Sequence, residues 1–212
     1  MAPMEINMNN INVIDLACFI GAYFLGSIPF GLLFTKWFGM GDIREIGSGN
    51  IGATNVLRMG NKKVAILTFL CDALKGMVPA GLASFLYPEI APGIAIMAVV
   101  GHVFPIWLKF KGGKGVATAF GATLGLNWPL ALMMLVTWTA IAATTRLSSL
   151  AALVTTVLSP VFAYILTPLI LVFYTLGLAL LLIFTHKNNI QRLIQGQESK
   201  IGDTSESQDS DD

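Results

Sequence analysis

Residues 149–185 read SLAALVTTVLSPVFAYILTPLILVFYTLGLALLLIFT and contain no Asp, Glu, Lys or Arg. Pro168 divides this run into two apolar segments, 149–166 and 168–185. An α-helix needs ~20 apolar residues to cross the hydrocarbon core of a bilayer, and each segment is close to that length. Proline is tolerated in membrane helices. The run therefore predicts two consecutive transmembrane helices.

The rest of the chain continues this pattern. Further apolar segments are expected at 13–35, 64–87, 91–108, 115–126 and 129–144. Hydrophobic residues make up 55% of the chain and charged residues 12%, whereas a soluble domain carries about 25% charged residues. These proportions predict an all-α, polytopic integral membrane protein with about seven transmembrane helices. They exclude a soluble globular enzyme with a separate membrane anchor, because no polar stretch is long enough to form such a domain.

Segment 115–126 is too short for a full span, so it is either a short tilted helix or a re-entrant piece. The distribution of charge favours a crossing. If all seven segments cross, every Lys and Arg except Lys75, which lies inside segment 64–87, falls on one side of the membrane. Cytoplasmic loops carry the excess of Lys and Arg. The expected topology therefore has the N-terminus outside and the C-terminus in the cytoplasm.

The chain shows no evident internal repeat, and a single transmembrane domain is expected over residues 1–200. Residues 201–212 read IGDTSESQDSDD. Because this composition is polar and acidic, it predicts a disordered tail.

The unusual chemistry falls in three polar stretches on the predicted cytoplasmic face. The first, residues 47–58, reads GSGNIGATNVLR. Glycine lets the backbone approach a ligand and point its N–H groups inward, and arginine can bind a phosphate bidentately. The candidate ligand-binding residues here are Gly47, Ser48, Gly49, Asn50, Thr54, Asn55 and Arg58. We reject the match to the dinucleotide pattern GxGxxG, because no βαβ unit surrounds it. The simpler alternative is a flexible loop that ends in an ordinary basic residue.

The second stretch, residues 109–118, reads KFKGGKGVAT and runs into the short apolar segment. A helix start with free N–H groups and a nearby lysine attracts anions. The Walker phosphate-binding pattern fails here, because Gly115 rather than Ser or Thr follows Lys114. The candidates are Gly112, Gly113, Lys114 and Gly115. The alternative is a basic anchor that binds lipid head groups.

The third stretch, residues 186–193, reads HKNNIQRL and follows the last apolar segment. Asn189 is three residues after His186 and so lies on the same helical face. Ser149, at the start of segment 149–166, would line the same surface, although serines at helix starts are commonly caps. Within segment 64–87, Asp72 and Lys75 are expected to pair along one helix face. A phosphate contact from Lys75 is the alternative.

With these three motifs in this order, the chain resembles the bacterial acyl-phosphate–dependent glycerol-3-phosphate acyltransferases, the PlsY family. The resemblance covers almost the whole chain. It implies transfer of a fatty acyl group from acyl phosphate to the 1-hydroxyl of sn-glycerol 3-phosphate, which gives lysophosphatidic acid and phosphate in phospholipid biosynthesis. It also implies a multi-pass enzyme of the bacterial inner membrane whose active site faces the cytoplasm. The implied partners are both substrates, membrane lipids and, functionally, the enzyme that makes acyl phosphate; no nucleic acid is expected.

The resemblance also implies residue roles. The residues essential in the family correspond to Ser48, Arg58, Lys114, His186 and Asn189. Gly112, Gly113 and Gly115 would take part in phosphate binding, Ser149 would contact substrate, and Glu198 would be structural.

Both implied substrates are phosphate anions, so the site needs positive charge, which Arg58, Lys114 and backbone N–H groups can supply. Acyl phosphate is a mixed anhydride with a good leaving group and needs no covalent enzyme nucleophile. Ser48 is therefore expected to donate a hydrogen bond rather than to be acylated. The hydroxyl proton would pass either to His186 or to a substrate phosphate. No metal-ligand spacing or cofactor motif is present in the sequence, so neither a metal nor a cofactor is expected.

Two other functions use the same features. A membrane transporter of an organic phosphate would use the cationic glycine loops as its binding site, but it predicts inverted repeats and broken helices near mid-membrane. A lipid-binding structural membrane protein explains the lysines but not the glycine runs.

Overall fold

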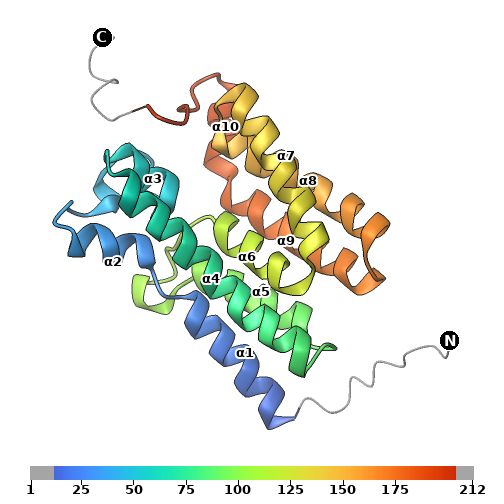
Figure 1. The fold of residues 1–212 in the computed structure, drawn as a ribbon. Coiled ribbons are helices and arrows are strands. Elements are labelled where there is room, and N and C mark those ends of the chain that lie inside the picture. The colour runs from blue at the N-terminus through green and yellow to red at the C-terminus, as the bar shows by residue number, and fades with distance from the viewer. Residues whose placement is uncertain (1–11, 204–212) are drawn as a thin grey trace, which may run out of the picture.

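A computed structural model describes residues 12–203, and all regular elements within them are helices (Figure 1). The α-helices are α1 (Val13–Gly26), α2 (Phe30–Trp37), α3 (Ala53–Arg58), α4 (Lys62–Leu86), α5 (Ala91–Val103), α6 (Val116–Leu126), α7 (Trp128–Thr145), α8 (Ser148–Leu166), α9 (Leu169–Thr185) and α10 (Lys187–Ile194). Two short 3₁₀ turns occur at Ile43–Glu45 and Ile106–Leu108. The predicted all-α class is confirmed. Of the tail predicted to be disordered, residues 201–212, the structure describes residues 201–203, where the Ile201 N–H donates to the Arg146 carbonyl at 2.7 Å. Residues 204–212 lie outside the described residues.

The helices follow the predicted segments closely, but two segments are interrupted. Segment 13–35 is divided into α1 and α2 at Pro29, which has no N–H to continue a helical hydrogen-bond ladder. Within segment 91–108, the α-helix ends at Val103, and a 3₁₀ turn begins after Pro105. In both places the α-helix ends two or three residues before a proline and helical structure resumes directly after it.

Five stretches are long and apolar enough to cross a membrane: Val13–Trp37, Lys62–Leu86, Ala91–Leu108, Trp128–Thr145 and Ser148–Leu166. The bent pair α9 and α10, which meet at 65°, gives a sixth if it is taken as one span. Helix α6 has 11 residues and is shorter than a span. The described residues therefore contain five or six candidate spans, and a total of seven requires α6 to cross as well.

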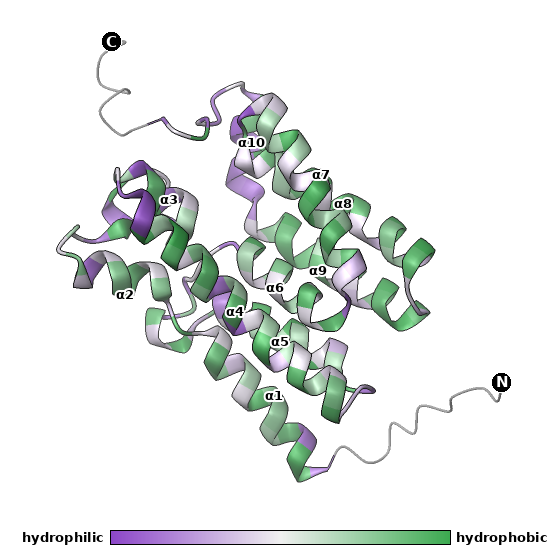
Figure 2. Cartoon of the chain, viewed as in Figure 1, coloured by the Kyte–Doolittle hydropathy of each residue, from purple (hydrophilic) through white to green (hydrophobic). Residues whose placement is uncertain are grey.

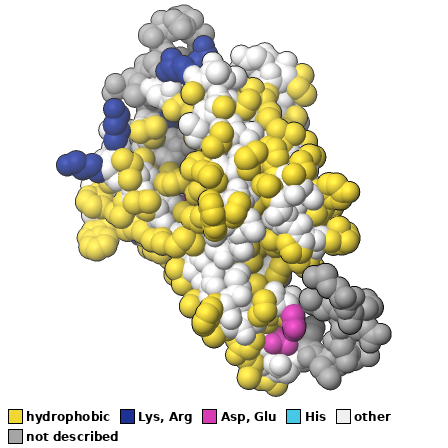
Figure 3. Space-filling model, turned by 45° about the vertical axis from the view of Figure 1, so that its right-hand side comes forward, with side chains coloured by type: hydrophobic (Ala, Val, Ile, Leu, Met, Phe, Trp, Pro, Cys, Tyr) yellow, Lys and Arg dark blue, Asp and Glu magenta, His cyan; other side chains and the backbone are white. Residues whose placement is uncertain are grey.

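The outer surface suits a lipid environment. Large apolar side chains such as Phe85, Tyr164 and Leu180 are 87%, 75% and 73% exposed. Hydrophobic residues dominate the long helices in Figure 2. On the face shown in Figure 3, Lys and Arg gather at one end while apolar side chains cover most of the remainder. Because lipid tails are as apolar as these side chains, contact between the two in a bilayer carries no hydrophobic penalty.

The helices pack in two groups. Helix α4 packs most extensively against α6, and α1 packs against α5. Helices α7, α8 and α9 pack on one another and reach the first group through α6 and α5. The α4–α6 approach requires Gly121, where a Cβ would lie 1.9 Å from the Ala73 carbonyl oxygen. Small residues allow such close packing of membrane helices. Both groups of helices contribute residues to the pocket described next.

Candidate active site

The three polar stretches meet in one pocket with a volume of about 220 Å³. Its walls come from α3 and the loop before it, from α4 and the end of α5, from α6 and the loop before it, from α7, α8 and the end of α9, and from Glu198. The predicted residues that line it are Ser48, Asn50, Thr54, Asn55, Arg58, Lys114, Gly115, Ser149 and His186. The fold therefore brings most of the predicted substrate-binding and catalytic residues to a single site.

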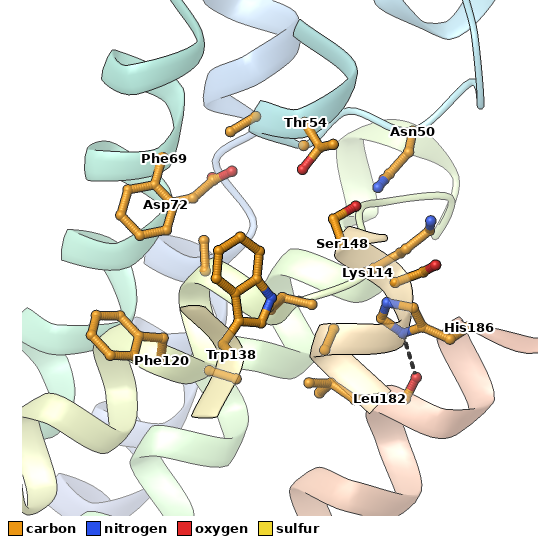
Figure 4. A pocket seen from close by; sticks show the side chains of 18 of the residues that line it. Asn50, Thr54, Phe69, Asp72, Lys114, Phe120, Trp138, Ser148, Leu182 and His186 are labelled. Carbon is orange, nitrogen blue, oxygen red and sulfur yellow. Dashed lines mark hydrogen bonds between the residues drawn. The ribbon is translucent and has the colours of Figure 1, made fainter. Parts of the chain in front are cut away.

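The pocket has two chemically different parts (Figure 4). Asn50, Lys114 and His186 lie toward one side, where hydroxyl and amide groups also gather. Phe69 from α4 and Trp138 from α7 lie on the other side, where the Asp72 carboxylate lies beside Phe69. The arrangement can hold a molecule with a charged head and an apolar tail.

Asn55 organises the first loop. It is 1% exposed, and its Nδ2 donates hydrogen bonds to the carbonyls of Ile43 at 3.0 Å and Ile46 at 2.9 Å. Its Oδ1 accepts a hydrogen bond from the Ser48 N–H at 3.2 Å. Gly47 has a φ of +57°, and a Cβ there would lie 2.6 Å from Asn55 Oδ1, so the turn requires glycine. The amide of Asn55 is thus committed to the loop, where it positions Ser48 against the pocket.

The loop before α6 is held against the end of α5. The Gly112 N–H donates to the Val103 carbonyl at 3.0 Å, and the Gly113 N–H donates to the His102 carbonyl at 3.1 Å. A Cβ at Gly113 would lie 2.1 Å from His102 Nε2. Gly112 and Gly113 therefore place Lys114 without lining the pocket themselves, and their contact with phosphate stays a prediction.

A buried charge cluster lies beneath this loop. Lys75 Nζ is 2.7 Å from Asp72 Oδ1, which confirms the predicted pair, and it also donates to the Ile28 carbonyl at 2.7 Å. His102 Nδ1 lies 3.6 Å from the same Asp72 oxygen. Asp72 and His102 line the pocket, whereas Lys75 does not. The cluster thus connects α4 to the part of α5 that holds the Lys114 loop.

His186 is oriented by the end of α9. Its Nδ1 lies 2.7 Å from the Leu182 carbonyl oxygen, which can only accept a hydrogen bond, so Nδ1 carries the proton. Burial lowers the pKa of His186 to about 4, so the ring is neutral near pH 7 and Nε2 has a free lone pair. Thr185 Oγ1 donates to the Lys114 carbonyl at 3.0 Å and ties the two motifs together.

Two cations line the polar part. Burial lowers the pKa of Lys114 to about 8; Glu198 opposes this effect and Arg58 adds to it. Burial also lowers the pKa of Arg58. Within residues 12–203, Arg58 Nε is buried and has no hydrogen-bond partner. Unpaired positive charge of this kind is suited to binding an anion.

Asn189 is buried but does not line the pocket. Its Nδ2 donates to Glu198 Oε1 at 2.6 Å, and Arg192 Nε donates to Glu198 Oε2 at 2.7 Å. Burial raises the pKa of the Glu198 carboxyl, but the hydrogen bonds from Arg192 and Asn189 outweigh burial and hold the pKa below its usual value. Asn189 therefore contacts Glu198, which lines the pocket, rather than lining the pocket itself. The glycine-rich motifs alone do not predict this contact.

Comparison with known proteins gives a consistent answer. A sequence model described as glycerol-3-phosphate acyltransferase matches residues 16–196. The chain is 50% identical over 187 residues to the glycerol-3-phosphate acyltransferase of Brucella anthropi, an alignment that covers 88% of this chain and 93% of the relative. It is 51% identical over 190 residues to that of Bartonella quintana, covering 87% and 90%. The chain belongs to the glycerol-3-phosphate acyltransferase family.

Solved structures agree with this membership. The crystal structure of PlsY, an integral membrane glycerol 3-phosphate acyltransferase, in its glycerol 3-phosphate form, superposes with a TM-score of 0.84 at 38% identity. The match covers 88% of this chain and 95% of that one. The lysophosphatidic acid form of PlsY gives a TM-score of 0.82 at 36% identity. The resemblance to the PlsY family is confirmed, and the chain is an integral membrane acyltransferase of phospholipid biosynthesis.

Sequence reasoning did not find the apolar lining of this acyltransferase. Phe69, Phe120, Met134 and Trp138 line the pocket, but each lies within an apolar helix that also exposes large apolar side chains on the outer surface, such as Phe85 of α4 and Val136 of α7. Hydropathy does not distinguish apolar side chains that face lipid from apolar side chains that face the pocket. Only the packing of α4, α6 and α7 shows which side chains turn inward.

The pKa of Lys114 predicts how affinity for an anionic ligand changes with pH. The ammonium is charged below about pH 8 and loses its charge above it. We therefore expect the Kd for glycerol 3-phosphate, measured by titration calorimetry, to rise as the pH increases through this value. Lys114→Arg should remove the rise, because a guanidinium stays charged. A rise that persists in Lys114→Arg would assign the effect to another group.

Proposed function

We propose that the protein transfers a fatty acyl group from acyl phosphate to the 1-hydroxyl of sn-glycerol 3-phosphate, giving lysophosphatidic acid and phosphate. The observation that supports this reaction is the amphiphilic pocket, which joins Arg58, Lys114 and His186 to an apolar part lined by Phe69 and Trp138. The product has the same two parts, a phosphate head and an acyl chain. A soluble phosphate ester alone would not need the apolar part.

The proposed substrate-binding residues follow from their positions. Arg58 and Lys114 bind the phosphate groups, and their charges act strongly in a partly dry cavity. Ser48, Asn50, Thr54 and Ser149 line the same part and supply hydrogen bonds. Gly47, Gly49, Gly112, Gly113 and Gly115 shape the loops that carry these groups. Asn55 and Asn189 position Ser48 and Glu198.

In the proposed reaction, the substrate hydroxyl oxygen attacks the carbonyl carbon of acyl phosphate. The new ester C–O bond forms, and the bond between the acyl carbon and the phosphate oxygen breaks. His186 Nε2 takes the hydroxyl proton and returns it to the departing phosphate. Positioning two bound substrates supplies much of the rate enhancement, and the cations stabilise the negative charge that develops on the carbonyl oxygen.

We propose seven crossings of the bacterial inner membrane, with the N-terminus outside and the pocket open to the cytoplasm. Helices α6 and α9 add to the five long candidate spans. The helix ends and loops expected on the cytoplasmic side carry Lys36, Arg44, Lys62, Lys63, Lys109 and Lys111, in line with the excess of cytoplasmic Lys and Arg. A cytoplasmic pocket would receive glycerol 3-phosphate from solution and acyl phosphate from the enzyme that makes it.

An assay on protein purified in mild detergent tests the reaction and the donor together. Labelled glycerol 3-phosphate would be supplied with either acyl phosphate or acyl-CoA. We expect lysophosphatidic acid with an equal amount of released phosphate, from acyl phosphate only. Product from acyl-CoA would overturn the proposed donor. No product from either donor, with protein shown to be folded, would overturn the reaction, and uptake of glycerol 3-phosphate into liposomes would then indicate a transporter.

A further inference from the structure

The chain crosses the polar end of the bundle after α10. Residues 197–203, here called the C-terminal strap, run from the α10 side toward α3 (Figure 1). Glu198 of the strap lines the pocket, with a side chain that is only 4% exposed. The strap therefore connects the two groups of helices at the end where the polar part of the pocket lies.

Arg146 holds the far part of the strap. The Ile201 N–H donates to the Arg146 carbonyl at 2.7 Å, and Arg146 Nη2 donates to the Ile201 carbonyl at 3.0 Å. Arg146 ends α7, two residues before Ser148 of the pocket lining. This reciprocal pair ties the strap to the α7–α8 junction.

The near part of the strap contacts Arg58, one of the predicted phosphate-binding residues. Arg58 Nη2 lies 3.5 Å from the Ser199 carbonyl oxygen. The neighbouring Glu198 is held by Asn189 and Arg192. A shift of the strap would therefore move both the Arg58 guanidinium and the Glu198 carboxylate.

We propose that Arg146 is a positioning residue for glycerol 3-phosphate: it fastens the C-terminal strap across the polar part of the pocket, and the strap sets the placement of Arg58 and Glu198. Arg146 itself does not line the pocket, so it acts through the strap. The inference rests on the proposed function for its substrate. It concerns affinity for the small soluble substrate rather than the chemical step.

The backbone of Arg146 supplies a sharp test. Its φ is +60°, a conformation that glycine adopts without the steric cost that other residues bear. Arg146→Gly therefore removes the guanidinium contact while keeping the turn that links α7 and α8. Lys109→Gly is the matched control, because Lys109 is an exposed basic residue with a φ of +51° whose N–H donates to the Ile106 carbonyl within its own turn.

We expect Arg146→Gly to raise the KM for glycerol 3-phosphate roughly tenfold and to change kcat by less than about threefold. Arg146→Lys should recover part of the loss, because its ammonium can donate to the Ile201 carbonyl. Lys109→Gly should leave both constants unchanged. An unchanged KM in Arg146→Gly, a fall in kcat alone, or an equal effect in Lys109→Gly would overturn the proposal.

Hydrogen exchange provides a readout that does not depend on turnover. Exchange of the strap amides, measured by mass spectrometry, should accelerate in Arg146→Gly and should slow when glycerol 3-phosphate is added to the unmutated protein. Unchanged exchange in both experiments would overturn the strap's role. Absence of lysophosphatidic acid from the unmutated protein would instead overturn the proposed reaction, while the exchange result would still decide whether Arg146 fastens the strap.

Discussion

His186→Gln is expected to lower kcat by ~10²–10⁴-fold, the range associated with loss of a general base. His186 is neutral near pH 7 because burial lowers its pKa to about 4. Its Nδ1 proton is committed to the Leu182 carbonyl, which leaves Nε2 to accept the substrate proton. The substituted amide nitrogen or oxygen is a very weak base at this pH.

Two further variants separate proton transfer from folding. His186→Asn places an amide N–H near the position of Nδ1, so it can keep the hydrogen bond to Leu182 while removing the base, and it should lose as much activity as His186→Gln. Lys187→Gln, at the exposed neighbouring residue, should retain kcat. The measurement is phosphate release under saturating substrates, with thermal unfolding to show that each variant is folded. Substantial residual turnover in folded His186→Gln would assign the proton to a substrate phosphate instead.

Lys75→Met is expected to reduce the free energy of unfolding by ~3–5 kcal/mol, because removing one partner of a buried ion pair leaves an uncompensated charge. Lys75 and Asp72 have side chains that are 1% and 3% exposed, and their charged atoms lie 2.7 Å apart. In the variant, His102 Nδ1 stays 3.6 Å from the Asp72 carboxylate, too far for a good hydrogen bond. The midpoint of thermal unfolding in detergent, followed by circular dichroism, measures the loss.

The double variant Asp72→Leu with Lys75→Met should recover much of this stability, because replacing both charges by apolar groups removes the unpaired carboxylate. Lys63→Met, an exposed lysine in the first turn of the same helix, should have little effect. A double variant as unstable as Lys75→Met would show that packing around α4, rather than charge pairing, determines the stability of this region.

The family was predictable from sequence because its motifs are local. The stretches at 47–58, 109–118 and 186–193 place Ser48, Arg58, Lys114 and His186 in polar loops between apolar segments, where their chemistry is conspicuous. The apolar segments also located the long helices, because a membrane-spanning helix needs a contiguous run of about 20 apolar residues. Only the two proline breaks, at Pro29 and Pro105, divided segments that hydropathy had joined.

The functions of several predicted residues could not be separated in the same way. Asn55 and Asn189 have the same amide chemistry as Asn50, yet their side chains bind the Ile43 carbonyl and the Glu198 carboxylate, respectively. Gly112 and Gly113 are adjacent to Lys114 but face the end of α5. Sequence spacing gives the neighbours along the chain, whereas these partners come from other helices.

By itself, the sequence determined that the chain is helical, membrane-embedded and a member of an acyltransferase family, because hydropathy and short motifs are properties of contiguous residues. Only the tertiary structure decided which aromatic side chains line the pocket, that His102 approaches the Asp72–Lys75 pair, and where the C-terminal strap crosses. These features depend on contacts between helices far apart in the chain. Burial and hydrogen bonding at such contacts arise only when the helices pack.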